Sequence, residues 1–202
     1  MKRADHIRPP EGPGRSDVPP GQFVTSKFPV LTYGPTPRIS PDSWRFRITG
    51  LVEVERDLDW QQFMALPQSV VTADFHCVTQ WSRLDNTWQG VLAKEVLALA
   101  PPRPEAHFVM AHCYGGYSTN LPLEALTEHN VLFAHTHEGQ PLEAAHGGPL
   151  RLVVPSLYAW KSAKWVNGLE FMAEDRPGFW ESRGYHIRGD PWREERFWSE
   201  VS

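Results

Sequence analysis

Proline constrains the fold of this chain more than any other residue type. The 202 residues include 19 prolines, and many of these lie within the first 41 residues. Proline lacks a backbone N–H donor, so it is excluded from helix interiors and from central strands. Together with the nine tryptophans, this distribution favours long, ordered loops packed on a β-rich body over a bundle of helices.

The composition fits one folded domain that follows an N-terminal arm. Hydrophobic residues make up 41% of the chain, which is enough for a core in a domain of this length. Residues 1–22 are mainly Pro, Gly and charged side chains, and we expect them to form a flexible or surface-draped arm. Residues 23–202 are expected to form a single domain, and residues 23–37 are apolar enough to lie extended across its body.

The charge and the N-terminal residues limit the partners and the location of the protein. A formal net charge of −4 and the lack of a basic stripe argue against a nucleic-acid partner. No apolar run approaches the length of a membrane-spanning helix, so we expect no membrane span. The first residues show neither the apolar core of an export signal nor a twin-arginine pair, which favours a cytoplasmic location. Cys77 and Cys113 are then expected to be reduced.

Short apolar segments predict many strands and few helices. Alternating or β-branched patterns predict strands at residues 44–50, 69–73, 106–111, 131–135, 150–155 and 166–172. Helical spacing predicts helices at residues 60–66, with Asp59 as the cap, 91–99 and 122–126. Because this order is not a regular βαβ alternation, we predict an α+β fold of mixed β-sheets with short helices and long loops. The aromatic residues of 177–202 indicate that this tail packs on the domain.

A cysteine follows the predicted strand at residues 69–73. Cys77 stands beside His76, and Arg83 follows six residues later. A thiolate is a nucleophile or a soft-metal ligand, and it needs nearby positive charge to form near neutral pH. A buried structural cysteine is the alternative interpretation.

Two further polar clusters combine glycine or a hydroxyl with positive charge. They lie at residues 146–151 and 161–164. Exposed backbone N–H groups beside Arg or Lys form a cradle that suits a phosphate. Solvated surface charge is the alternative for Lys161 and Lys164. Arg151 interrupts an apolar strand, and an inward-pointing arginine needs a partner.

Histidines suggest a different kind of site. His135 and His137 lie on one face of a predicted strand. Together with His76, His112 and Cys113 they could form a zinc site, although their spacing matches no standard zinc pattern.

The order of several motifs is more specific than any one of them. The motifs are residues 28–34, Asp74-Phe75-His76-Cys77-Val78-Thr79-Gln80-Trp81-Ser82, Trp88-Gln89-Gly90-Val91, His146-Gly147-Gly148-Pro149-Leu150-Arg151 and Pro155-x-x-Tyr158-x-x-Lys161-x-x-Lys164. In this order they resemble the molybdopterin-binding domain of the sulfite oxidase family over nearly all of residues 23–198. The chain is most similar to the small bacterial sulfite-oxidase-like oxidoreductases, which are cytoplasmic. The resemblance implies the sulfite-oxidase-type fold and a molybdenum cofactor.

The resemblance also assigns roles to individual residues. Cys77 would be the thiolate ligand of molybdenum, a metal whose ligand sphere is rich in sulfur. The residues implied to bind the cofactor are His146 and Arg151 at the pterin and its phosphate, Lys161, Ser162, Ala163 and Lys164 at the phosphate end, Leu31, Thr32 and Tyr33 as a covering segment, and His76 and Cys113 as neighbours.

The substrate side departs from the family pattern. Sulfite oxidases carry a cluster of arginines at the anion substrate, whereas here only Arg83 can be nominated, with Tyr158 as a second catalytic candidate. Further pocket candidates are Asp85, His112 and Tyr117. Because Asp85 would repel sulfite, sulfite oxidation is not the favoured activity.

The expected function is oxygen-atom transfer on a small oxyanion or on an S- or N-oxide. No haem is expected, so a separate electron-transfer partner is implied. The alternative is a non-catalytic molybdopterin-binding protein.

Overall fold

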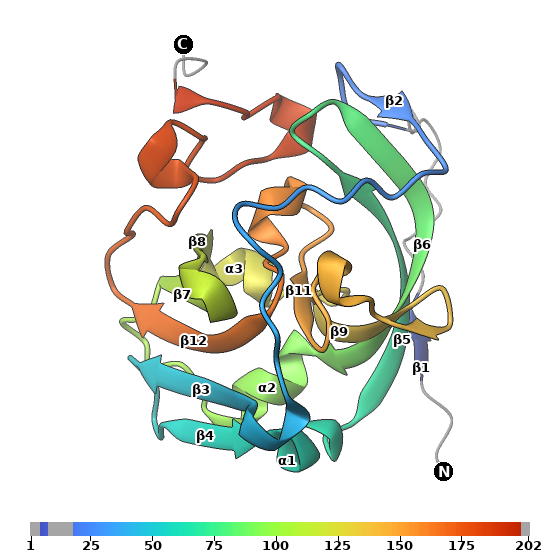
Figure 1. The fold of residues 1–202 in the computed structure, drawn as a ribbon. Coiled ribbons are helices and arrows are strands. Elements are labelled where there is room, and N and C mark those ends of the chain that lie inside the picture. Colours follow the sequence, from blue (N-terminus) through green and yellow to red (C-terminus); the bar gives the residue numbers. More distant parts are fainter. Residues whose placement is uncertain (1–4, 8–17, 199–202) are drawn as a thin grey trace.

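Two β-sheets form the body of the molecule (Figure 1). The structure is a computed structural model that describes residues 5–7 and 18–198. The first sheet contains β1 (Asp5–Ile7), β2 (Phe23–Val24), β5 (Gln68–His76), β6 (Trp81–Leu92), β9 (Leu132–His137), β10 (Gln140–Pro141) and β11 (Arg151–Val153). The second contains β3 (Arg45–Gly50), β4 (Arg56–Asp59), β7 (Phe108–Cys113), β8 (Ser118–Pro122) and β12 (Val166–Met172).

The helices are few and short. They are α1 (Trp60–Met64), α2 (Ala93–Leu99) and α3 (Leu123–Leu126). Single 3₁₀ turns lie at Pro41–Ser43, Tyr114–Gly116, Ala144–His146, Ala159–Lys161, Glu181–Arg183 and Pro191–Arg193. Within the described part of the chain, no helix has the length and apolar character needed to cross a membrane. The predicted α+β class with mixed sheets is confirmed, since β1, β2 and β12 each make one parallel pairing and the other pairings are antiparallel.

The main difference from the predicted elements is β6, a strand of 12 residues. Val91 and Leu92 complete this strand by pairing with β9, so the helix predicted from residue 91 begins at Ala93. The sequence hides the strand because Leu84 and Asp85 stand opposite the single residue Asp74 of β5, and this bulge breaks the apolar alternation of β6. Five short strands, β1, β2, β4, β8 and β10, were also not predicted.

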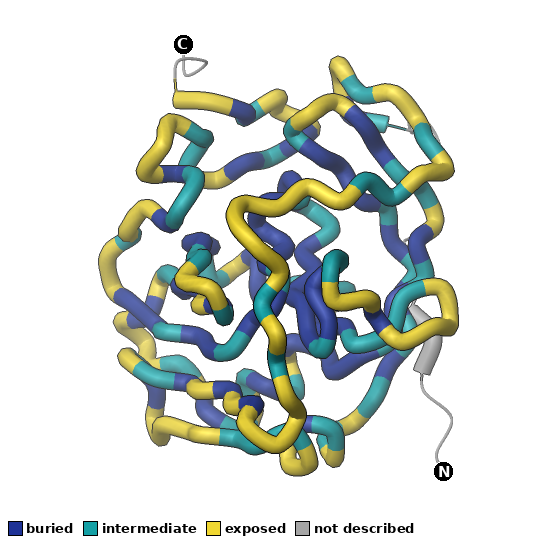
Figure 2. Tube along the Cα trace, viewed as in Figure 1, coloured by how far each residue is buried: buried dark blue, intermediate teal, exposed yellow. Residues whose placement is uncertain are grey.

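Apolar side chains are buried in two clusters. The larger lies between the two sheets and includes Trp44, Phe46 and Phe133. The smaller lies on β5 and β6 around Phe75 and Trp88, and it reaches the end of β5. Figure 2 shows that the strands carry most of the buried positions. This second cluster forms the apolar wall on which the site is built.

Segments near the two ends of the chain pack on this body. Residues 25–37, here called the strap, cross the face of the sheets in extended form, as predicted, and are mostly exposed (Figures 1 and 2). Part of the expected arm is ordered, because β1 pairs with β5 and Pro19 is buried. The expectation for residues 1–4 and 8–17 falls outside the described residues. Residues 177–198, here called the tail, pack on the domain, and the Trp198 indole donates to the carbonyl of Glu181.

Candidate active site

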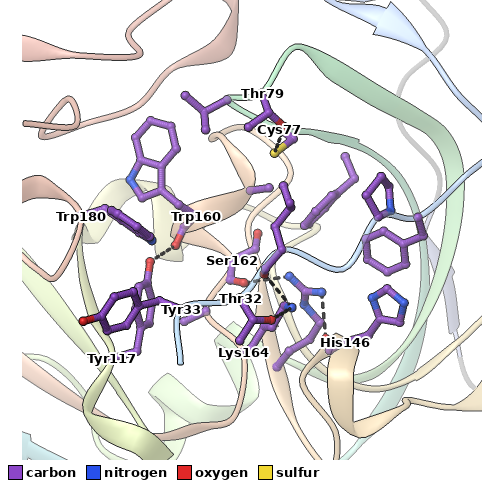
Figure 3. Close-up of a pocket in the computed structure, with 18 of the residues that line it drawn as sticks. Thr32, Tyr33, Cys77, Thr79, Tyr117, His146, Trp160, Ser162, Lys164 and Trp180 are labelled. Carbon is purple, nitrogen blue, oxygen red and sulfur yellow. Dashed lines mark hydrogen bonds between the residues drawn. The ribbon is translucent and has the colours of Figure 1, made fainter. Parts of the chain in front are cut away.

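A cavity of about 340 Å³ lies beneath the strap. Its walls come from residues 28–33 of the strap, the end of β5 with the following turn, residues 159–165 and the tail. The lining contains one thiol, from Cys77, and three basic side chains, from His146, Arg151 and Lys164, but no Asp or Glu among the described residues. Figure 3 shows Cys77 and Thr79 at one end, with His146 and Lys164 at the other. The cavity therefore suits an anionic ligand that also meets a thiol.

Cys77 occupies the first position of a tight turn that joins β5 to β6. The amide of Gln80 donates to the Cys77 carbonyl at 3.0 Å, and the Cys77 amide donates to the Trp81 carbonyl at 2.8 Å. The sulfur lies 3.1 Å from the hydroxyl of Thr79 and is nearly buried. Burial raises the pKa of the Cys77 thiol, and the Thr79 hydrogen bonds and the charge of Arg196 oppose this rise. A metal ion that displaces the proton would stabilise the thiolate.

Arg151 brings a buried positive charge to the cavity wall. Its Nη1 and Nη2 donate to the carbonyl oxygens of His146 at 3.0 Å and Ser162 at 2.9 Å, while Nε has no partner among the described residues. The guanidinium lies 5.0 Å from the centroid of the Phe75 ring and 5.5 Å from that of Trp88. Burial lowers the pKa of Arg151 to about 9. An anion in the cavity would compensate this charge.

Lys164 connects the strap to the basic end of the cavity. Its Nζ donates to the carbonyl of Leu31 at 2.9 Å, to the hydroxyl of Thr32 at 2.9 Å and to the carbonyl of Ala145 at 2.7 Å. Burial and the charge of Arg151 lower the pKa of Lys164 to about 8. These acceptors are neutral, so the ammonium group retains its charge for a ligand.

His146 completes the basic end. Its ring stacks on Phe28 of the strap, with 4.2 Å between the ring centroids and an interplanar angle of 10°. Its Nδ1 is buried and has no hydrogen-bond partner in the described part of the chain. Burial, with the charges of Arg151 and Lys164, lowers the pKa of His146. The neutral ring can therefore exchange a hydrogen bond with a polar heterocycle.

Between the Cys77 end and the basic end, aromatic side chains that include Tyr33, Tyr117, Trp160 and Trp180 form one side of the cavity (Figure 3). Trp180 stacks on Tyr185 at 5.0 Å between centroids, and Tyr117 donates its hydroxyl hydrogen to the carbonyl of Trp160 at 2.6 Å. Burial and the charge of Cys77 raise the pKa of Tyr185. Sequence reasoning did not select Trp180 and Tyr185. The only signal was the aromatic content of the tail, which predicted packing and not a position in a site.

The cavity lining brings together most of the residues that the sequence nominated for it. They are Leu31, Thr32, Tyr33, Cys77, Tyr117, His146, Arg151, Ser162, Ala163 and Lys164. The other nominated residues do not line it.

Lys161 differs most from its expected role as a phosphate ligand. Its side chain is fully buried, and Nζ lies 2.6 Å from the carboxylate of Glu181. It also donates to the carbonyls of Asn120 at 2.8 Å and Ile187 at 2.7 Å. The ammonium group is therefore fully engaged in fastening the tail to the domain and does not reach the cavity.

Arg83 and Tyr158, the other catalytic nominations, also lie outside the lining. Arg83 contacts Asn86, His137 and Glu138, with 3.0 Å to the Glu138 carboxylate. Tyr158 is buried beneath the guanidinium of Arg196, which lies 5.1 Å from its ring centroid. Both side chains are held by intramolecular contacts away from the cavity.

Four further candidates are likewise directed elsewhere. The Nδ1 atom of His76 lies 2.8 Å from the hydroxyl of Ser82, and Cys113 is buried, which raises its pKa. Asp85 is exposed, and His112 pairs with Glu170 at 3.0 Å.

The structure does not gather the histidines into a zinc site. Among residues 5–7 and 18–198, no group of three or more His, Cys, Asp or Glu side chains is placed to hold a metal ion. His135 contacts Gln68 at 2.9 Å, and His137 contacts Asn86 at 3.0 Å.

Several known proteins are similar in sequence to most of this chain. It is 47% identical over 181 residues to the uncharacterized oxidoreductase YuiH of Bacillus subtilis, covering 89% of this chain and 91% of that protein. It is 29% identical to a sulfite oxidase of Arabidopsis thaliana, over 79% of this chain. This chain spans about half the length of that sulfite oxidase, since the match covers 50% of it.

The fold is found in a larger enzyme of known structure. The sulfane dehydrogenase SoxCD of Paracoccus pantotrophus matches with a TM-score of 0.64 and 23% identity, over 74% of this chain and 42% of that one. A family model described as the oxidoreductase molybdopterin binding domain matches residues 33–180. This match covers the strap from Tyr33, all strands of the two sheets except β1 and β2, and the cavity residues from Tyr33 to Trp180. The chain therefore belongs to the family of oxidoreductase molybdopterin-binding domains.

Proposed function

We propose that this protein is a molybdenum-cofactor-dependent enzyme that transfers an oxygen atom to or from a small substrate. One observation carries the proposal. The buried, uncompensated charge of Arg151 and the thiol of Cys77 face one cavity whose described lining has no carboxylate. A separate electron-transfer partner would complete each two-electron cycle.

The residues of the cavity fit the pterin cofactor. Nδ1 of His146 and Nε of Arg151 are buried polar atoms without partners among the described residues, and burial of such atoms is costly. A phosphate and a polar heterocycle would supply the missing partners at this end. When bound, the cofactor would supply a molybdenum centre that accepts an oxygen atom while giving up two electrons, or gives an oxygen atom while taking up two electrons.

Cys77 would hold the metal from the end opposite the basic residues. Its thiol is protonated in the free protein because burial raises its pKa, so metal binding would release a proton. The hydroxyl of Thr79, at 3.1 Å, would orient the sulfur. At the other end, Arg151 would bind the phosphate and the charge of Lys164 would attract it, while the contacts of Lys164 with Leu31 and Thr32 would keep the strap closed over it.

The aromatic side of the cavity favours an uncharged oxide over an oxyanion such as sulfite. Tyr33, Trp180 and Tyr185 line this side, and none of them offers a cation. Arg83, the nominated anion-binding residue, is held by Glu138 outside the cavity. The raised pKa of Tyr185 keeps its hydroxyl protonated, so it can donate a hydrogen bond to the oxide oxygen. We therefore propose an S- or N-oxide as the substrate class.

The alternative is a molybdopterin-binding protein without turnover. It is favoured by the cavity lining, in which Arg151, placed at the cofactor end, is the only arginine among the described residues. The presence of the thiol argues against it, because binding of a pterin alone does not require a metal ligand.

Metal analysis of protein from a molybdate-fed host tests the proposal. We expect about one molybdenum and one pterin per chain, with the pterin measured by fluorescence after oxidation and release. Cys77→Ser should fold normally but lose turnover of oxides from a reduced dye. Cys113→Ala, which removes a buried thiol outside the cavity, should keep turnover.

Three other outcomes of these experiments would contradict the proposal or favour its alternative. Full turnover by Cys77→Ser would contradict the role of the thiol. Full metal loading of the wild type without turnover of any oxide or sulfite would favour the non-catalytic alternative. Zinc without pterin would contradict the proposal as a whole.

A further inference from the structure

We propose that Arg196 is a positioning residue that fixes the turn carrying Cys77. The inference rests on the proposed role of Cys77 and extends the site into the tail. Arg196 and its contact Pro20 both lie outside residues 33–180, which the family model matches. Sequence elements beyond the matched domain would therefore set the geometry of the thiol.

Arg196 contacts the turn directly after Cys77. Its Nη1 donates to the carbonyl of Val78 at 2.7 Å, and its Nη2 donates to the carbonyl of Pro20 at 3.4 Å. The guanidinium also lies over the ring of the buried Tyr158, with 5.1 Å to the ring centroid. Only 7% of Arg196 is exposed, so this is a buried, charge-assisted contact. Such a contact restricts the turn more than an exposed arginine could.

The turn depends on groups outside itself. Besides the Val78 carbonyl, the Cys77 carbonyl accepts from the side-chain amide of Gln22 at 3.1 Å, and the Gln80 carbonyl accepts from the amide of Phe23 at 2.9 Å. Gln80 has a φ of 72°, a conformation that is strained for residues other than glycine. Strain of this kind persists only where the surroundings enforce it, and here they are residues 20–23 and Arg196.

Arg196 connects these surroundings. It touches both the N-terminal segment, at Pro20, and the turn, at Val78. A side chain added at Gly21 would meet Glu194 and Arg196 within 3.2 Å, so the two segments are in close contact. Loss of the guanidinium would free the Val78 carbonyl and separate the two segments at the turn.

Hydrogen exchange of the cofactor-free protein tests the positioning role. In Arg196→Gln, amides of the turn, among them those of Cys77 and Gln80, should exchange about tenfold faster than in the wild type. Arg193→Gln is the matched control, because Arg193 is exposed and lies in the same segment. Its turn should exchange as in the wild type. Faster exchange confined to residues 18–24 and 191–198, with wild-type exchange of the turn, would overturn the inference. Arg196 would then only hold the tail against the N-terminal segment.

A second variant keeps the test decisive if Arg196→Gln does not fold. Arg196→Met keeps an unbranched side chain that can occupy the same space, but it has no donor for the Val78 carbonyl. Faster exchange that is confined to the turn and its partners would support the inference, whereas wild-type exchange of the turn would overturn it.

The cofactor-bound protein offers a spectroscopic measurement that would not change if Arg196 only stabilised the fold. Arg196→Gln should shift the g-values of the Mo(V) electron paramagnetic resonance signal, because the thiolate would be presented differently, and Arg193→Gln should not. Unchanged g-values and metal content in a folded Arg196→Gln would contradict positioning. If the wild type binds no molybdenum, the proposed function fails, and the exchange experiment still decides the role of Arg196.

Discussion

Arg151 is the first residue of β11, and its side chain is buried inside the molecule. Two carbonyl oxygens, from His146 and Ser162, replace part of its hydration, and three aromatic rings surround the rest. Among the described residues no acidic group opposes the effect of burial, which lowers the pKa of Arg151 to about 9. A buried ion without a counter-ion is costly, so the site is most stable when an anion is bound.

Replacement of Arg151 should abolish cofactor retention. In Arg151→Met, we expect molybdenum and pterin per chain to fall at least about tenfold, because a charged hydrogen-bonding partner of the anion is lost. Arg83→Gln is the control, since Arg83 lies outside the cavity. Metal analysis and pterin fluorescence give the readout. Wild-type loading of Arg151→Met would show that the anion binds elsewhere.

His137 gives the protein a specific sensitivity to acid. Burial and the charge of Arg83 lower its pKa to about 4, against the opposing effect of Glu138. The unfolded chain, with a pKa of about 6.5, binds more protons between these values, so stability is complete above pH ~6.5 and is lost as the pH falls towards ~4. The contribution is on the order of 2 kcal/mol.

Urea unfolding between pH 7 and pH 4.5 tests this contribution. His137→Gln removes the titrating group, so its free energy of unfolding should decline less steeply with acid than that of the wild type. Parallel curves for the two proteins would show that other groups cause the acid sensitivity.

At the scale of elements, β6 joins the turn of Cys77 to the rest of the first sheet. It pairs with β5 on one side and with β9 on the other, and its first residues pair with β2. At Gly90 the backbone of β9 comes so close that an added Cβ would overlap the carbonyl of Phe133. The bulge between Gln89 and Gly90 lies at the same point. Glycine is required here because no side chain can fit between the strands.

The Gly90→Ala substitution should therefore destabilise the protein by about 3 kcal/mol or more, because the β6–β9 pairing must separate. Gly139→Ala is the matched control. Gly139 has a φ of 73° and no heavy atom within 4 Å of an added Cβ. Its replacement should cost only about 1 kcal/mol of backbone strain. Denaturant unfolding of both variants measures the difference, and equal costs would contradict the packing argument.

At the scale of the whole molecule, charge is distributed unevenly. The chain carries a formal net charge of −4, yet the described lining of the cavity contains the cations of Arg151 and Lys164 and no carboxylate. Low-dielectric walls concentrate this positive potential. The protein thereby attracts an anion into the cavity although its overall charge is negative.

Anion affinity should fall at alkaline pH. Lys164, with a pKa of about 8, is charged below that pH and loses its proton above it. Sulfate keeps its charge over this range, so its affinity for the cofactor-free protein, measured by calorimetry, should drop about tenfold between pH 7 and pH 9. Lys164→Met should bind more weakly at pH 7 and show a smaller drop. Equal pH dependence in both proteins would exclude Lys164 as its source.

The sequence by itself determined the class of the fold and key residues at both ends of the site. The strand that leads to Cys77, the helix capped by Asp59 and the motif with His146 and Arg151 are encoded by residues close together in the chain. In α1, for example, Asp59 accepts from the amide of Gln62 at 2.8 Å, as its sequence position predicts. Signals of this kind depend only on neighbours within a few residues.

Only the tertiary structure decided which charges face the cavity and which segments complete it. Lys161 and Lys164 stand three residues apart, yet Lys161 pairs with Glu181 and only Lys164 lines the cavity. Tyr185 lines the cavity, and Arg196 contacts Val78 across 118 residues of sequence. Such choices follow from the packing of distant segments, because burial, and not the local sequence, determines which partner each charge can reach.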